Sequence, residues 1–330
     1  MAYISGQVLK NGNPISGAKV TLIKQFNIKN IADIALWLKA DTGVIKDASG
    51  NVSEWQDQSG NNNHATQTDP THQPVLLDNR YNGKPAIYFD GNNKYLQLPG
   101  DFFRNIPALD IFVVVSHAAP LPDDRQTYII GTFIGTEARV QFRANQFSAN
   151  ETPNLVIGGQ RLDSGSWYGI VSNNIYEAQQ RYIHNCIMDF VNGRLAIYFD
   201  QLFDTEDTSF PGGGNTDDTD SINTIGIRKG DLGNLDRPLF GYLYEMLIFY
   251  RVLSDDERQN IYDYLNLKYN CAKTENHDSA TIVDMQFTDA NGNYQFNNLE
   301  NNSQYHVFVE YEDQEGQYHC ESYPFITPVV

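Results

Sequence analysis

The chain has 330 residues, of which 41% are hydrophobic and 12% aromatic, and its formal net charge is −18 at pH 7. This length allows two domains with their own cores, and the composition is that of a globular protein. Nucleic acid is excluded as a favoured partner, because such binding is driven by Lys and Arg and the chain has only 23 of them against 41 acidic residues.

No targeting segment is expected. Residues 1–6 lead directly into a predicted strand, without the basic and apolar regions of a signal peptide. No apolar run reaches the roughly 18 residues that span a bilayer, so we expect no membrane insertion. The three cysteines are odd in number and lack metal-ligand spacing, which predicts free thiols. They are Cys186, Cys271 and Cys320.

The first segment, residues 4–24, predicts two strands joined by a turn that contains Gly12 and Pro14. A single hairpin is marginally stable in water, so this segment needs partners. Its natural continuation, residues 287–299, arrives only near the C-terminus. The sequence therefore predicts one small β-domain whose halves are separated by an inserted domain.

The inserted segment is rich in predicted strands. Residues 111–117 form a continuous apolar strand, typical of the centre of a sheet, and residues 186–200 form a hairpin around Asn192-Gly193. Further strands are predicted at residues 31–38, 223–228 and 240–250. Residues 52–65 predict a strand that ends in a long polar turn, and residues 83–96 predict a strand, a turn and another strand. One helix follows, in which Ser254 and Glu257 form a capping box.

After residue 270 the small domain resumes. Strands are predicted at residues 280–287, 294–296, 305–311 and 318–325, the last with a proline, Pro324, that suits a sheet edge. We expect the strand that ends near Lys24 to meet the strand that begins near Thr281. An inserted domain is tolerated where its two ends lie close together.

The outer halves resemble the carboxypeptidase-regulatory or transthyretin-like β-sandwich. The residues that carry this resemblance are Ser5-Gly-x-Val8, Pro14-x-x-Gly-Ala-x-Val20, Thr288-Asp-x-x-Gly-x-Tyr-x-Phe296 and Leu299. The resemblance implies an immunoglobulin-like β-sandwich made of residues 1–26 and 275–330. Such domains are usually stalks or spacers in larger assemblies.

The insert is similar to the concanavalin A-like, laminin-G-like jelly roll. The carrying residues are Leu36-Trp-Leu-Lys-Ala-Asp41, Trp55-x-Asp-x-Ser-Gly-Asn61, Ile87-Tyr-Phe-Asp-Gly91, Tyr95-Leu96 and the run from Gly241 to Gln259. The resemblance implies an all-β fold, with a jelly roll over residues 27–274 that carries one C-terminal helix. It implies carbohydrate or protein binding in many members and glycan hydrolysis in some.

Glycan hydrolysis needs two positioned carboxylates. Glucanases of this fold carry them in a Glu-x-Asp-x-Glu run, which is absent here. The nearest pair on a strand, Glu54 and Asp57, has a spacing that places the two side chains on opposite faces. The sequence therefore predicts a protein that is not an enzyme and has no catalytic residues.

Calcium is the one cofactor for which the sequence offers ligands. Asp57, Asn61 and Asn63 present the hard oxygens that Ca²⁺ prefers, although no loop has EF-hand spacing. Asp and Asn in turns usually bond their own backbone, which is the structural alternative for this loop. A second group of oxygens is formed by Asp217, Asp218 and Asp220.

Carbohydrate binding calls for an exposed aromatic ring beside polar hydrogen-bonding groups. Trp167 and Tyr168 lie in a polar stretch and are the candidate binding residues, with core packing as the alternative for Trp167. Trp37 and Trp55 lie in apolar strands and are predicted to be core residues.

Small β-modules of both kinds, on a chain without a signal peptide, resemble pieces of phage virion proteins. We therefore expect a non-enzymatic protein at the virion surface, in a capsid decoration, a head fibre or a tail fibre. Its expected partners are other virion proteins, through the split β-sandwich, a host-surface glycan and a second copy of the chain. The alternatives are a bacterial carbohydrate-binding adhesin and a glycan hydrolase of the same fold.

Overall fold

The structure is a computed structural model. It describes residues 2–24, 28–81, 83–118, 127–133, 139–145, 153–229, 235–269, 282–300, 303, 305–313, 318–326 and 328–329. Contacts divide the chain into two compact units, Met1–Ile31 with Asp255–Val330, and Ala32–Ser254. The sequence placed the boundaries at 26/27 and 274/275, with the helix on the insert. The contacts group this helix, α1 (Asp255–Tyr269), with the smaller unit, where it contacts β27 (Tyr318–Ile326).

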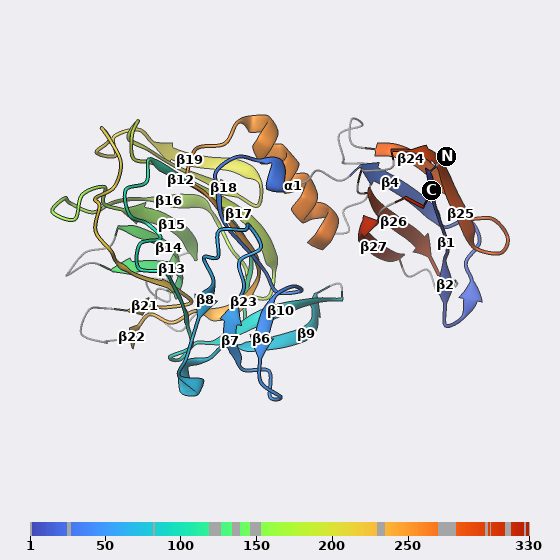
Figure 1. Cartoon of the computed structure of the whole chain (residues 1–330), viewed down its shortest axis with the longest axis horizontal. Coiled ribbons are helices and arrows are strands. Elements are labelled where there is room, and N and C mark those ends of the chain that lie inside the picture. Colours follow the sequence, from blue (N-terminus) through green and yellow to red (C-terminus); the bar gives the residue numbers. More distant parts are fainter. Residues whose placement is uncertain are drawn as a thin grey trace. The chain divides into compact units, whose positions relative to one another are not determined.

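The larger unit consists of two antiparallel sheets (Figure 1). The eight-stranded sheet has the order β19 (Leu202–Asp207), β18 (Arg194–Phe199), β17 (Arg181–Asp189), β12 (Ala108–His117), β23 (Phe240–Phe249), β10 (Lys84–Asp90) and β9 (Val75–Tyr81), and β5 (Ile34–Lys39) also pairs with β23.

The nine-stranded sheet has the order β16 (Tyr168–Ile175), β15 (Asn154–Gly159), β14 (Val140–Asn145), β13 (Thr127–Phe133), β20 (Ile222–Ile225), β11 (Leu96–Leu98), β8 (Ala65–Thr66), β7 (Val52–Trp55) and β6 (Val44–Lys46). The short strands β21 (Arg228–Lys229) and β22 (Leu235–Asp236) pair with each other. The larger unit also contains one 3₁₀ turn, η2 (Pro70–His72), and a second, η1 (Ile28–Asn30), belongs to the smaller unit.

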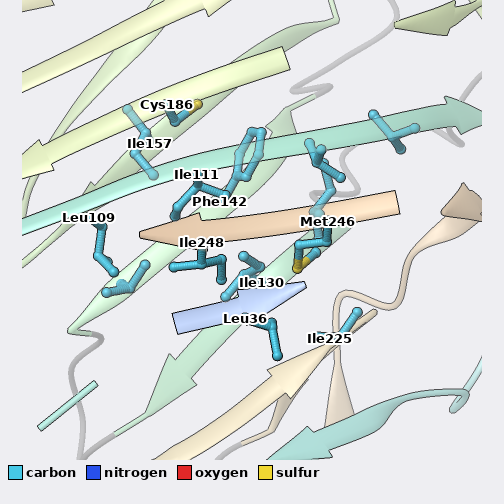
Figure 2. Close-up of a cluster of buried hydrophobic side chains, with 14 of the residues drawn as sticks. Leu36, Leu109, Ile111, Ile130, Phe142, Ile157, Cys186, Ile225, Met246 and Ile248 are labelled. Carbon is cyan, nitrogen blue, oxygen red and sulfur yellow. The ribbon is translucent and has the colours of Figure 1, made fainter. Parts of the chain in front are cut away.

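The core of the larger unit lies between its two sheets (Figure 2). Leu109, Ile111 and Met246 come from the eight-stranded sheet, and Phe142 and Ile157 face them from the nine-stranded sheet. Alternate residues along the strands of the nine-stranded sheet therefore face inward, and their neighbours form the sheet's outer face.

The elements with the strongest sequence signals form as predicted. All ten residues of β12 are buried, as its apolar run indicated. The β17–β18 hairpin turns at Gly193, whose φ of 72° suits glycine. In α1 the side chains of Ile261, Leu265 and Tyr269 are buried, which confirms the predicted apolar face.

The smaller unit also contains antiparallel sheets. Its strands are β1 (Ala2–Gln7), β2 (Leu9–Lys10), β3 (Asn13–Pro14), β4 (Lys19–Lys24), β24 (Ile282–Phe287), β25 (Asn293–Leu299), β26 (Tyr305–Glu312) and β27. β1 pairs with β25, and a second sheet has the order β24-β4-β26-β27. The predicted N-terminal hairpin is therefore wrong, because its two main strands belong to different sheets and only the short β2 and β3 pair across the turn.

The two halves of the smaller unit join where the sequence predicted. β4 pairs with β24, and Ile23 and Ile282 are partners in this pairing. The last strand, β27, lies at the edge of its sheet, as its proline indicated. The fold is all-β, with one α-helix among the described residues, and no described helix is long and apolar enough to cross a membrane.

Candidate functional site

Trp167 lies on the outer face of the nine-stranded sheet, directly before β16. The side chain is 37% exposed. A β-carbon built on Gly169 would lie 2.3 Å from its Cη2 atom, and one built on Gly158 would lie 2.6 Å from its Cζ2 atom. The six-membered ring therefore rests on the backbone of β15 and β16, at a position where neither strand has a side chain.

The two glycines belong to one row of paired residues that crosses the sheet. Gly169 pairs with Gly158, Gly158 with Gln141, and Gln141 with Gly131. All four point away from the core, because their neighbours Phe142 and Ile157, among others, lie in it. The row provides a surface of small and polar groups beside the indole of Trp167.

The loop that carries Trp167 is held by a buried arginine. Arg139 is fully buried, and its guanidinium donates hydrogen bonds to the Asp163 carboxylate at 2.8 Å and to the carbonyl oxygens of Phe103 and Thr219 at 3.0 Å. The backbone N–H of Asp163 donates to the Asp217 carboxylate at 2.7 Å. These bonds hold the segment between β15 and β16, which carries Trp167, at its middle.

A positively charged group lies beside the indole. The guanidinium carbon of Arg143 is 5.8 Å from the centroid of the Trp167 ring and 5.9 Å from that of Tyr128. The Tyr128 hydroxyl donates to Gln141 Oε1 at 3.1 Å and accepts from Arg237 Nη1 at 3.4 Å. We refer to Trp167, Arg143, Tyr128, Gln141 and Arg237 as the Trp167 cluster.

Arg143 is the most buried charge of this cluster, since only 8% of it is exposed. Burial lowers the pKa of its guanidinium, and the nearby charges of Arg237 and Arg228 lower it as well, whereas Tyr128 raises it. Among the described residues its Nε and Nη1 atoms have no hydrogen-bond partner. A buried donor without a partner is costly and calls for an explanation.

The structure separates the two predicted binding residues, Trp167 and Tyr168. Tyr168 pairs with Gly159, which faces the core, and its ring contacts the buried ring of Phe210 edge to face at 6.2 Å. The two aromatic rings therefore lie on opposite faces of the sheet, and only Trp167 belongs to the cluster.

The predicted metal residues Asp57, Asn61 and Asn63 do lie together in one loop. The Asp57 carboxylate accepts bonds from the backbone N–H groups of Trp37 and Ser59 at 2.9 Å, from that of Asn63 at 3.1 Å and from the Ser59 hydroxyl at 2.7 Å. The Asn61 and Asn63 side-chain amides donate to the backbone of β5. These bonds already occupy the Asp57 carboxylate, so the loop has a structural role.

Asn61 and Asn63 also line an open polar cavity of about 380 Å³, together with Asp33, Asp101 and Tyr250. Burial, with smaller effects of Asp101 and Asp57, raises the pKa of the Tyr250 hydroxyl. The hydroxyl donates to the carbonyl oxygen of Phe102. Within the described residues no group of three or more His, Cys, Asp or Glu side chains could hold a metal ion.

The three acidic residues of β19 are engaged in the fold. Asp204 accepts hydrogen bonds from the backbone N–H groups of Asn173 and Asn174 at 2.6 and 2.9 Å. Glu206 pairs with Arg194 at 2.8 Å, and Asp207 accepts from the Ser209 N–H. Each of these carboxylates stabilises β19 or its connection to β16.

No protein-family model matches the chain, and no curated protein matches its sequence. Solved structures do resemble it. The sialidase of Trypanosoma rangeli has 13% identity and a TM-score of 0.48 over 70% of this chain, and a SAP-like pentraxin of Limulus polyphemus has 16% and 0.41 over 64%. Domain 4 of an extracellular GH43 arabinanase from Geobacillus stearothermophilus has 14% and 0.48 over 69%.

The matched regions cover different shares of these proteins. They comprise 93% of the pentraxin and 98% of the arabinanase domain, but only 32% of the sialidase, so the chain matches about a third of that enzyme's length. The prediction that the chain is not an enzyme is corrected by these matches, because they include sialidases and a domain of an arabinanase.

Sequence reasoning found Trp167 but missed the rest of the cluster. Arg143, Tyr128 and Gln141 come from β13 and β14, which contain none of the residues that carry the jelly-roll resemblance. One signal was available: Gly158 and Gly169 lie close to Trp167 in the sequence, and glycine within a strand often marks a close approach of another group.

Proposed function

We propose that the larger unit binds a carbohydrate on the Trp167 cluster. The observation that carries the proposal is the exposed indole of Trp167, which lies on the Gly158–Gly169 pair with hydrogen-bonding side chains beside it. A sugar ring combines an apolar face of C–H groups with polar hydroxyls. An aromatic ring next to a small number of placed polar groups is suited to such a ligand.

The decisive experiment is a glycan array probed with the full chain, with Trp167→Ala and with Phe203→Ala. Phe203 is a matched control, because it is a more exposed aromatic, at 57%, on β19 of the other sheet. We expect the wild type and Phe203→Ala to bind the same glycans and Trp167→Ala to lose them. Binding that survives in Trp167→Ala, or no binding by the wild type, would contradict the proposal.

The array hits are then tested as substrates. Release of reducing ends from a bound glycan would show that the larger unit acts on its ligand as well as binding it. Retention of the intact glycan would show binding alone. Both outcomes are compatible with a glycan site at Trp167, and they separate a lectin-like from a hydrolytic role.

The location of the protein is a second part of the proposal. We place it at the surface of a phage virion, attached to other virion proteins through the smaller unit. The division of the chain into a split unit and an inserted one supports this, since the first can anchor while the second is displayed. Detection of the chain in many copies on purified particles tests it, and its presence on bacterial surfaces alone would favour the adhesin alternative.

A further inference from the structure

The Trp167 cluster contains an arginine whose surroundings suit a negatively charged ligand. Arg143 projects from β14 to the outer face, opposite to the core residues Phe142 and Ala144. Although only 8% of it is exposed, no described carboxylate lies within ion-pair distance, and Nε and Nη1 have no hydrogen-bond partner among the described residues.

The other buried arginine described in this unit, Arg139, shows what a structural role looks like. Arg139 donates to two carbonyl oxygens, the Asp163 carboxylate and the Thr219 hydroxyl. Among the residues that the structure describes, Arg143 makes ring contacts with Tyr128 and Trp167 and no hydrogen bond through Nε or Nη1. Both terminal nitrogens of Arg139 therefore donate hydrogen bonds within the fold, whereas Nε and Nη1 of Arg143 have no acceptor among the described residues.

The neighbouring positive charges also favour an anion near the Arg143 guanidinium. Arg237 donates to the Tyr128 hydroxyl, and its charge acts on Arg143. Positive groups thus gather on this face, although the chain as a whole has a net charge of −18. An anion bound here would relieve their mutual repulsion, and its attraction to Arg143 would be strong because the surroundings are largely buried.

We propose that the glycan bound on this face is an acidic one, whose sugar carboxylate pairs with Arg143 while the ring packs on Trp167. A guanidinium matches a planar carboxylate through two parallel hydrogen bonds, which a lysine ammonium does not reproduce. The inference rests on the glycan-binding function proposed above and adds the chemical class of the ligand.

The test compares matched ligands: 3′-sialyllactose against lactose, and trigalacturonate against the neutral galactose trimer. Each is titrated into the full chain and into Arg143→Gln, Arg143→Lys and Trp167→Ala. We expect the wild type to bind at least one acidic ligand about tenfold or more tightly than its neutral counterpart. Arg143→Gln and Arg143→Lys should both lose this preference, while Trp167→Ala loses acidic and neutral ligands alike.

The control is Arg194→Gln, which removes a half-buried arginine of β18, away from the cluster, and should leave binding unchanged. The thermal unfolding midpoint without ligand shows that each variant folds. For Arg143→Gln it should equal or exceed that of the wild type, because an unpartnered buried charge is removed.

Failure of the inference can be distinguished from failure of the proposed function. Equal binding of acidic and neutral ligands, by the wild type and by Arg143→Gln, would overturn the acidic class and leave glycan binding intact. A preference confined to sulfated glycans on the array would also overturn the carboxylate assignment. Binding of no glycan at all would overturn both.

Discussion

Trp167 occupies the space that a side chain at Gly169 would need. The Cη2 atom of its indole lies 2.3 Å from the position of a β-carbon on that glycine, closer than such atoms come in real proteins. The contact makes Gly169 a part of the candidate site, although it has no side chain with which to touch a ligand.

Gly169→Ala should therefore push the indole away from the sheet. Trp37 and Trp55 are buried, so a red shift of the tryptophan emission would report a more exposed Trp167. Glycan binding should weaken in the same variant. Gly100→Ala is the control, because a β-carbon there makes only ordinary contacts, the nearest at 3.6 Å. An unchanged spectrum for Gly169→Ala would show that the ring is not held against the backbone.

Arg139→Met should destabilise the larger unit by about 3 kcal/mol, because the Asp163 carboxylate and two carbonyl oxygens lose a buried donor. Denaturant unfolding measures this as a lower midpoint. Arg104→Met is the matched comparison. Arg104 is more exposed and pairs with Asp218 and Asp220, so its loss should cost less than about 1 kcal/mol. Equal losses for the two variants would contradict the structural role of Arg139.

Asp57→Ala should destabilise the larger unit by about 2 kcal/mol, since four donors lose their shared acceptor. The loss should be the same with calcium and with EDTA, because these donors are N–H and O–H groups of the chain. Asp47 accepts similar hydrogen bonds from backbone N–H groups in an exposed turn, so Asp47→Ala should lower the free energy of unfolding by less than Asp57→Ala does. A midpoint that rises with calcium in the wild type and not in Asp57→Ala would instead support the metal site.

Stability should fall as the pH drops below about 6.5, the usual pKa of histidine. His117 is fully buried, and burial lowers its pKa to about 4. The unfolded chain takes up a proton at this residue below about pH 6.5, whereas the folded chain stays neutral until about pH 4, so protonation favours unfolding in this window. The loss from His117 alone is about 3 kcal/mol at the acidic end.

Unfolding free energies measured between about pH 7 and about pH 4.5 check this, with the difference between variants as the readout. In His117→Gln the decrease should be smaller than in the wild type. His72→Gln, at a less buried histidine bonded to the carbonyl oxygen of Asn93, is the control. If the unfolding free energies of the wild type and His117→Gln fell in parallel with pH, His117 would not be the source of the loss.

Much of the fold could be predicted because single elements carried strong local signals. The apolar run of β12, the Asn192-Gly193 turn and the capped helix each need only their own residues to be recognised. The N-terminal hairpin failed for the opposite reason. Its strands look adjacent in sequence, but β1 finds its partner in β25 and β4 finds its partners in β24 and β26, which only the folded chain brings together.

The candidate site could be predicted only in part, for a similar reason. Trp167 is conspicuous as an aromatic residue in a polar stretch. Three of the groups beside it, Arg143, Tyr128 and Gln141, come from β13 and β14, and their position beside Trp167 depends on the register of four strands. Tyr168 shows the limit most clearly: it follows Trp167 directly, yet the alternation of a strand turns it to the other face.

The pairing of Ile23 with Ile282 also sets an order of assembly during synthesis. Unit Ala32–Ser254 contains both of its sheets and can complete its core while the C-terminal strands are still being made. β4 must wait for β24 and β26, and β1 for β25. A chain released too early would hold a finished larger unit beside two strands with open edges, which are templates for aggregation. Strands β24, β25 and β26 thus cover edges that β1 and β4 leave open until the pairings form.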